Sequence, residues 1–493
     1  MSLAKKAAGG FVWTTAANIG ARVLTIASTF ALTRYLAPAV QGEVNLAYVL
    51  VATAGAATTL GVAQFVAANP KEGRDTAFHG SVLVLALGVL VCLGCLVAAE
   101  PVSHFLKVPG MARYVPGMAL AHFLERCGWV PRAVLVREMR FRLAGLRVAL
   151  GELVFAVSSV SLAYLGWGGD AIVGGNVARA FVGLVFLAVV IDWRDYLLPC
   201  RLALATMRKL LRFGLPLTIA SLFAMGAMSW DNSFMGYRFG EATVGIYNQA
   251  YRLAELPASS IGDQINDVIV PVFARTPDPE ARVRGFLRAA SLMGLVIFPM
   301  ALGLGAIAPT LVEVFYPTSY AGVAPFLVVL AVLSISRSLG HLAGSFLQVV
   351  GRTHVFMVID FLLVLAVLGF MAGLARFGAI WASVGVGVAY LLAFLLTLST
   401  LRQDGIRMRA VGAAVWRPLF ACAPMVGVVI GLRYGLSTSG LPAVLRLVLE
   451  LAGGAGAYVV AALVLAPKVS RDFIDLGKSV LQRRRGAAEP EAT

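Results

Sequence analysis

The chain has 493 residues, of which 59% are hydrophobic and only 13% are charged. A typical soluble domain carries about 25% charged residues, so this composition excludes a large soluble enzyme. The formal charge of +16 would suggest nucleic acid in a soluble protein, and the five cysteines indicate no disulfide framework. The meaning of the basic excess therefore depends on where it lies relative to the apolar stretches.

Apolar stretches of the length that a membrane-spanning helix needs follow one another along the whole chain. We find fourteen, at about 9–33, 44–69, 79–99, 112–130, 146–166, 170–191, 211–235, 242–272, 287–308, 322–349, 354–374, 378–400, 411–432 and 442–466. Arg22 interrupts the first, and apolar sequence continues to Leu36, which favours an uncleaved helix over a signal peptide. The sequence predicts an all-α, polytopic membrane protein.

The basic residues of the connecting loops alternate from one side of the membrane to the other. With a cytoplasmic N-terminus, the inside segments hold 29 Lys and Arg residues and the outside segments hold seven. Positively charged loops stay in the cytoplasm, so both termini are predicted to be cytoplasmic. The charge therefore reports topology, and no nucleic-acid partner is indicated.

A short internal repeat predicts two related halves. Residues 34–48 and 237–251 match at five positions with a fixed offset of 203, including Gly42/Gly245 and Asn45/Asn248. An even number of spans separates the copies, which predicts a parallel repeat about an axis along the membrane normal. The expected parts are two six-helix lobes at 1–200 and 201–405, two extra helices at 406–466, and a polar cytoplasmic tail at 467–493.

Two polar segments lie outside the predicted spans. The basic loop 131–147 is amphipathic, and it is either an interfacial helix that binds anionic lipid or an ordinary cytoplasmic loop. The tail from about residue 467 is expected to be disordered beyond its first turns.

The loops and motifs exclude several kinds of function. A membrane glycosyltransferase needs a sizeable region outside the membrane, whereas these outer loops are short. The sequence contains no Walker A, His-Glu-x-x-His or zinc-spaced pattern, so no cofactor or metal is predicted. Cys92 and Cys95 form a C-x-x-C inside an apolar stretch, where packing is the expected role.

Ionisable residues inside spans are costly and usually face the protein interior or a water-filled cavity. Arginines bind phosphate through paired hydrogen bonds and keep their charge. The candidate residues for binding an anionic substrate are Arg22, Arg252, Arg337 and Arg179. Structural ion pairing is the alternative for each.

Acidic residues within the spans are candidates for coupling transport to an ion gradient. These are Asp231, Glu255, Asp360 and Glu152, which would bind H⁺ or Na⁺ or else neutralise an arginine. Alternating access also needs helices that bend, and prolines remove a helical hydrogen bond. Pro216, Pro257 and Pro299 are the candidate hinges.

Short motifs in a fixed order carry a resemblance to a known family. They include Leu36-Ala37-Pro38, Pro131-Arg132-Ala133, Phe213-Gly214-Leu215-Pro216, Val244-Gly245-Ile246-Tyr247 and Pro271-Val272-Phe273. Together with the span layout, they resemble the Wzx-type polysaccharide flippases, a branch of the multidrug/oligosaccharidyl-lipid/polysaccharide exporter (MOP) superfamily. The resemblance covers nearly the whole chain.

The resemblance implies a flippase of the bacterial inner membrane rather than an enzyme. Its substrate would be an undecaprenyl-diphosphate-linked anionic oligosaccharide, carried by ion-coupled alternating access for O-antigen, exopolysaccharide or capsule assembly. The family's habit of placing arginine in the first helix implies that Arg22 faces the cavity. Membrane lipid, a polysaccharide polymerase and export machinery would be its partners. A peptidoglycan-precursor flippase, a multidrug or cation antiporter, a membrane glycosyltransferase and a scaffold are the alternatives.

Overall fold

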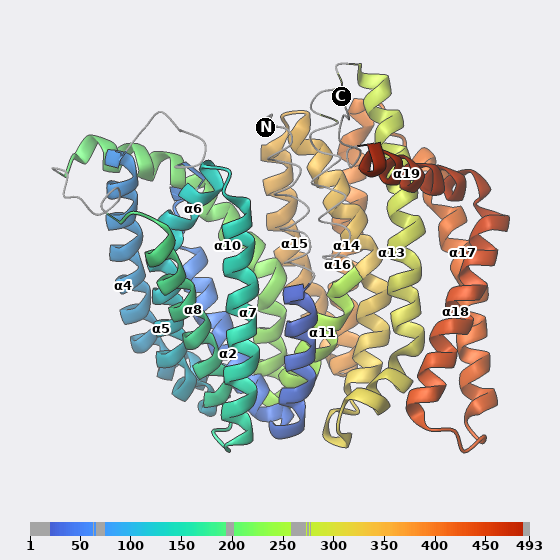
Figure 1. Ribbon diagram of the computed structural model, residues 1–493, viewed down its shortest axis with the longest axis horizontal. Helices are drawn as coiled ribbons and strands as arrows, with labels where there is room; N and C mark the ends of the chain where they lie inside the picture. The colour runs from blue at the N-terminus through green and yellow to red at the C-terminus, as the bar shows by residue number, and fades with distance from the viewer. Residues whose placement is uncertain are drawn as a thin grey trace, which may run out of the picture. The chain divides into compact units, whose positions relative to one another are not determined.

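The computed structural model describes residues 20–62, 64–65, 74–193, 202–257, 273, 276 and 278–486 (Figure 1). Every regular element in these ranges is a helix, so the all-α prediction is confirmed. The chain forms two compact units, residues 1–248 and 249–493. The boundaries of the predicted lobes remain a prediction.

The first unit is built from long helices that pack in neighbouring pairs. A helix over residues 20–35 is followed by α2 (Pro38–Ala56), α4 (Arg74–Phe105), α5 (Val115–Cys127), α6 (Trp129–Arg137), α7 (Phe141–Tyr164), α8 (Asp170–Val190) and α10 (Leu204–Phe239). The helix α7 packs on α8, and α10 packs on α2. A buried cluster that includes Val62, Val134 and Leu187 holds α6 and α8 together.

The helix α11 (Glu241–Pro257) follows α10 directly, begins in the first unit and ends in the second. The helix α10 ends at Phe239 because Gly240 adopts a φ of +85°, a conformation that glycine takes without strain. The helix α11 begins at the next residue. This tight connection places the start of α11 beside the end of α10.

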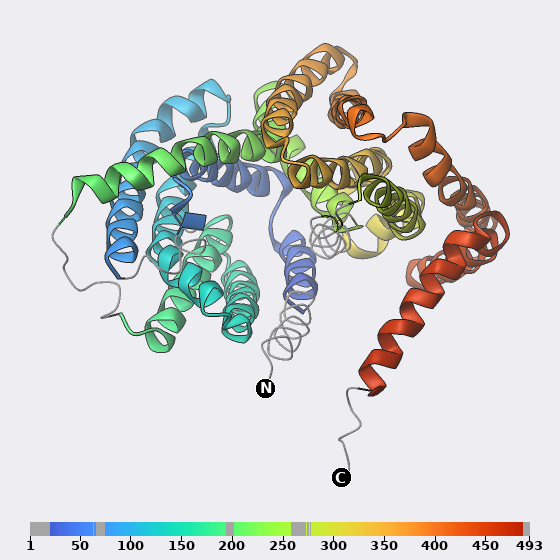
Figure 2. The same cartoon turned by 90° about the horizontal axis from the view of Figure 1, so that it is seen from above.

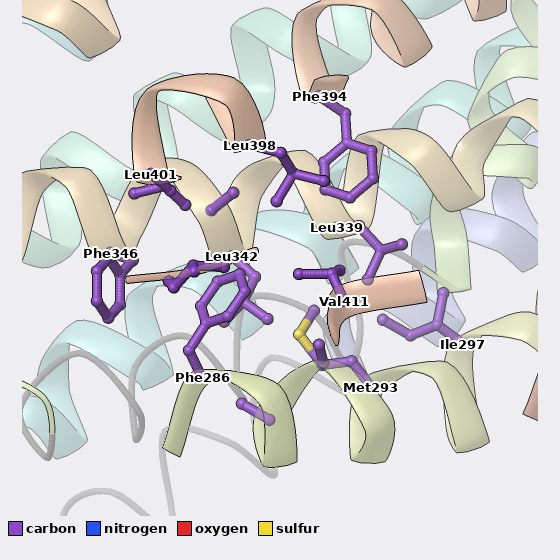
Figure 3. Close-up of a cluster of buried hydrophobic side chains, with 14 of the residues drawn as sticks. Phe286, Met293, Ile297, Leu339, Leu342, Phe346, Phe394, Leu398, Leu401 and Val411 are labelled. Carbon is purple, nitrogen blue, oxygen red and sulfur yellow. The ribbon is translucent and has the colours of Figure 1, made fainter. Parts of the chain in front are cut away.

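The second unit contains α13 (Pro279–Phe315), α14 (Val323–Val349), α15 (Thr353–Leu374), α16 (Ala379–Leu401), α17 (Met408–Leu436), α18 (Ala443–Leu465) and α19 (Pro467–Gly486). Its apolar core joins α13, α14, α16 and α17 (Figure 3). Phe286, Phe346 and Leu401 are each almost completely buried in it. This packing fixes α14, which carries Arg337.

Ten of the described helices are long and apolar enough to cross a membrane. They coincide with ten of the fourteen predicted spans, so a multi-pass membrane protein is confirmed. The other four predicted spans correspond to the helix at 20–35 and to α2, α5 and α11, and three of them, 9–33, 44–69 and 242–272, lie partly outside the described residues. The total of fourteen remains a prediction.

The polar segments differ from the sequence expectation. The tail is helical as far as Gly486, so the expectation of disorder after its first turns was wrong for this stretch. The basic loop contains the short helix α6, whose Val130, Val134 and Leu135 are buried in the protein. Apolar side chains inserted in a core give both segments an ordered position.

Candidate functional site

The first predicted arginine site lies in the second unit, around Arg337 of α14. Its guanidinium donates to the Glu255 carboxylate at 2.8 Å and to the Tyr251 hydroxyl at 2.6 Å. The rings of Tyr251 and Tyr390 lie 5.6 and 5.5 Å from the same guanidinium, close enough for cation–π attraction. Arg337 is only 8% exposed, so α11, α14 and α16 together enclose this charge.

A small cavity adjoins this cluster. It has a volume of about 30 Å³ and is lined by Tyr251, Glu255, Ser334, Arg337 and Tyr390 among apolar side chains. That space holds little more than a water molecule or two. An anion as large as a diphosphate therefore needs this site to open, or needs Glu255 to leave the guanidinium.

A second predicted arginine, Arg179 of α8, lies in an ion-pair cluster of the first unit. Its guanidinium stands 3.2 Å from the Glu152 carboxylate and 3.6 Å from that of Glu125. Glu152 also accepts a hydrogen bond of 2.9 Å from Thr25. Because residues three apart share a helix face, Thr25 places the half-buried Arg22 on the side of its helix that faces this cluster.

The predicted coupling residue Asp231 is fully buried on α10. One carboxylate oxygen accepts from the Tyr247 hydroxyl at 2.6 Å, and the other accepts from the backbone and side chain of Asn232. The amides of Asn45 and Asn248 both donate to the Asn232 side-chain oxygen, at 3.0 and 3.3 Å. A network of polar side chains therefore surrounds this carboxylate.

A close helix crossing lies next to this network and follows the internal repeat. A Cβ atom on Gly42 would stand 2.8 Å from the carbonyl carbon of Glu241, and one on Gly245 would stand 2.7 Å from that of Pro38. Both glycines and both contacted residues are related by the same offset of 203. Glycine at the crossing allows the backbones of α2 and α11 to approach closely.

The structure does not bring every predicted residue into these clusters. Arg252 is exposed on α11. Asp360 on α15 is half-buried, and no described side chain forms an ion pair with it. Pro216 and Pro299 lie inside α10 and α13, and Pro257 ends α11, while their role as hinges remains a prediction.

Sequence reasoning missed the uncharged members of these clusters. The most important are Tyr247, Tyr251, Tyr390 and the three asparagines. A signal for three of them was present, because Asn45/Asn248 and Tyr48/Tyr251 are two of the five matches of the repeat. Tyr390 and Asn232 lie outside the repeated segment, where the sequence carries no such signal.

Solved structures with the same arrangement of helices show which fold this chain has. The lipid II flippase MurJ, in an inward closed conformation, superposes with a TM-score of 0.74 over 94% of this chain and 100% of its own, at 10% identity. A multidrug resistance transporter of the MATE family in the MOP superfamily, in an inward-facing conformation, gives 0.64 over 80% of this chain and 95% of its own, at 16% identity. At these identities the likeness concerns the fold, which is that of a MOP transporter.

Sequence relatives then identify the family. The polysaccharide biosynthesis protein family matches residues 31–325, and the chain belongs to it. The chain is 24% identical over 336 residues to the lipopolysaccharide biosynthesis protein WzxC of Escherichia coli K12, which covers 68% of each chain. It is 26% identical over 325 residues to the succinoglycan biosynthesis transport protein ExoT of Rhizobium meliloti, which covers 64% of this chain and 65% of ExoT.

These findings confirm the predicted kind of protein. The chain belongs to the polysaccharide biosynthesis protein family as a Wzx-type polysaccharide flippase, a transporter rather than an enzyme, and its fold is that of the MOP transporters.

Proposed function

We propose that this flippase moves undecaprenyl-diphosphate-linked oligosaccharide repeat units across the bacterial inner membrane, with both termini in the cytoplasm. An ion gradient of H⁺ or Na⁺ drives the alternating access. The exported units serve O-antigen, exopolysaccharide or capsule assembly, together with a polysaccharide polymerase and export machinery.

The observation that carries this proposal is the enclosed guanidinium of Arg337, held by Glu255 and two tyrosine rings beside a cavity. A charge at membrane depth is costly and is retained where it serves function. Guanidinium is suited to phosphate oxygens, because its planar donors pair with two of them. Arg179 and Arg22 supply two further guanidinium groups in the first unit, next to Glu152 and Glu125.

Asp231 is the residue that we assign to ion coupling. It is a buried carboxylate with neutral hydrogen-bond donors at 2.6–2.9 Å, and a proton added to one of its oxygens would weaken the hydrogen bonds that this oxygen accepts. Glu255 and Glu152 are second candidates because each already pairs with an arginine. Asp360 is the remaining candidate.

The test is to deplete the protein and label undecaprenyl-linked sugars on each face of the inner membrane. Labelled units should accumulate on the cytoplasmic face and be absent from the outer face. Normal appearance on the outer face, in a strain that expresses no other flippase, would refute the proposal.

Variants then test the arginine site without leaving an unpaired charge. The double variant Arg337→Gln/Glu255→Gln removes both charges together, keeps the size of residue 255 and shortens residue 337, so folding should be preserved. Transport should fall strongly at an unchanged protein level. The matched control is Arg352→Gln/Asp404→Gln, which neutralises an ion pair of 3.0 Å between the start of α15 and the end of α16 and should leave transport intact.

The likeness to MurJ favours one further candidate, a flippase of peptidoglycan precursors. This function would require the protein to sustain growth when the cell's own precursor flippase is removed. We expect no such rescue, because the sequence relatives are polysaccharide transporters.

A further inference from the structure

The helix α19 lies at a different angle from the rest of the second unit. It follows α18 after the single residue Ala466, contacts α13 and α18 through its first turns, and runs crosswise to them and then outward (Figures 1 and 2). Since α18 is long enough to cross the membrane and α19 begins crosswise at its end, α19 lies at the membrane surface.

The first turns of α19 are anchored to the protein. The Ser470 hydroxyl donates to the Ala462 carbonyl at 3.0 Å, and Arg288 of α13 pairs with Asp472 at 3.2 Å. Val469 packs against a buried cluster that includes Leu295. These contacts hold the helix in its crosswise position.

The same face of α19 becomes exposed one turn later. Phe473 lies four residues after Val469, and Ile474 lies four residues after Ser470, so these side chains continue the anchored face. Yet Phe473 is 47% exposed and Ile474 is 44% exposed. An apolar face at this level is suited to the boundary between headgroups and acyl chains.

The opposite face of α19 is basic. Successive residues of a helix are rotated by about 100° around its axis. Lys468, Arg471 and Lys478 therefore lie within an arc of about 80° around the axis of α19. This arc is roughly opposite to Val469 and Phe473. All three are exposed. The helix contains six basic and two acidic residues, so its net charge complements an anionic surface.

We propose that α19 is an interfacial helix that binds the anionic phospholipid headgroups of the surrounding leaflet. Phe473 and Ile474 enter the apolar boundary, and Lys468, Arg471 and Lys478 contact headgroup phosphates. This role does not depend on which lipid-linked sugar the protein transports.

The experiment uses the full-length protein in nanodiscs of phosphatidylcholine, with or without phosphatidylglycerol. An environment-sensitive NBD label is attached at Phe473→Cys, in a variant whose native cysteines are replaced by alanine. The control position is Asp475→Cys, which lies on the polar side of the same helix. Dithionite, which enters the membrane poorly, reports how accessible each label is to water.

The label at residue 473 should be blue-shifted and protected from dithionite in discs that contain phosphatidylglycerol, and the label at 475 should react freely. Equal reaction at both positions in both kinds of disc would overturn the proposal. Size-exclusion chromatography shows that each labelled variant is folded.

Charge substitutions test the recognition of anionic lipid. Each basic residue near an anionic surface changes binding about fivefold, so Lys468→Gln/Arg471→Gln/Lys478→Gln should weaken insertion on the order of a hundredfold. The control Arg402→Gln/Arg407→Gln/Arg409→Gln removes the same charge from exposed positions between α16 and α17 and should not affect the label. Protection that is independent of phosphatidylglycerol and of the α19 charges would refute anionic recognition.

Discussion

The crossing of α2 and α11 gives a quantitative prediction, because a methyl group has no room there. In Gly245→Ala, the new Cβ would lie 2.7 Å from the Pro38 carbonyl carbon and closer still to its oxygen. Carbon atoms pack at about 3.5 Å or more, so the helix backbones would have to separate by about 0.8 Å at least. Backbone carbonyls cannot rotate away as a side chain does, so we expect a cost of about 2–3 kcal/mol, at the upper end of overpacking effects.

The assay is thermal unfolding of the purified protein, with transport measured in cells. A loss of this size in a unit of 248 residues corresponds to a fall in the melting temperature of roughly 4–12 °C. Gly431→Ala is the control, because its Cβ would meet no atom within 4 Å and an alanine in a helix gains about 0.5–1 kcal/mol over glycine. The two substitutions should therefore shift stability in opposite directions.

The double variant Gly42→Ala/Gly245→Ala sharpens this test. Both methyl groups separate the same two helices, so a displacement that accommodates one partly accommodates the other. The double variant should therefore lose less stability than the two single variants lose together. Costs at distant sites add to within about 0.3–0.5 kcal/mol, and the shortfall here should be larger than that. A Gly245→Ala protein as stable as Gly431→Ala, or strictly additive costs at Gly42 and Gly245, would refute the close crossing.

Three further substitutions test the buried polar groups by thermal unfolding. Glu255→Gln leaves Arg337 without its carboxylate and should destabilise the protein by about 3–5 kcal/mol, whereas the doubly neutral variant should be more stable than this single one; the reverse order would contradict the ion pair. Asn232→Leu removes the acceptor of two asparagine amides and should cost about 1–3 kcal/mol, so an unchanged melting temperature would exclude that network. Glu450 is fully buried and accepts a 2.8 Å hydrogen bond from Thr310, so Glu450→Leu should be more destabilising than Glu313→Leu at a half-exposed position; equal effects would show that Glu450 forms no stabilising hydrogen bond.

The helical class could be predicted from the sequence because the bilayer permits so few solutions. Backbone groups in lipid must bond within their own segment, so each long apolar stretch between polar loops becomes a helix. Ten spans follow from hydropathy alone. The helix of the tail was harder to predict from the sequence. It contains few apolar residues, and its anchoring to α13 and α18 depends on tertiary contacts.

The charged members of these side-chain clusters could be identified from the sequence, whereas their contact partners could not. A charge inside an apolar stretch is visible at once, which is how Arg337, Arg179 and Asp231 were found. The contact between Arg337 and Glu255 joins residues 82 positions apart, and that of Arg179 with Glu152 joins residues 27 apart. No helical spacing relates residues on different helices, so these pairs depend on tertiary packing.

The helix α11 connects the chemistry of the two predicted roles. Tyr247, Tyr251 and Glu255 follow one another at intervals of four residues and share one face of the helix. Tyr247 donates a hydrogen bond to Asp231, the proposed coupling residue. Tyr251 and Glu255 accept hydrogen bonds from Arg337, the proposed substrate-binding residue. Eight residues of helix span about 12 Å, and a helix transmits a rotation or shift along that length as one rigid element. The two proposed roles therefore draw on side chains of one face of the same helix.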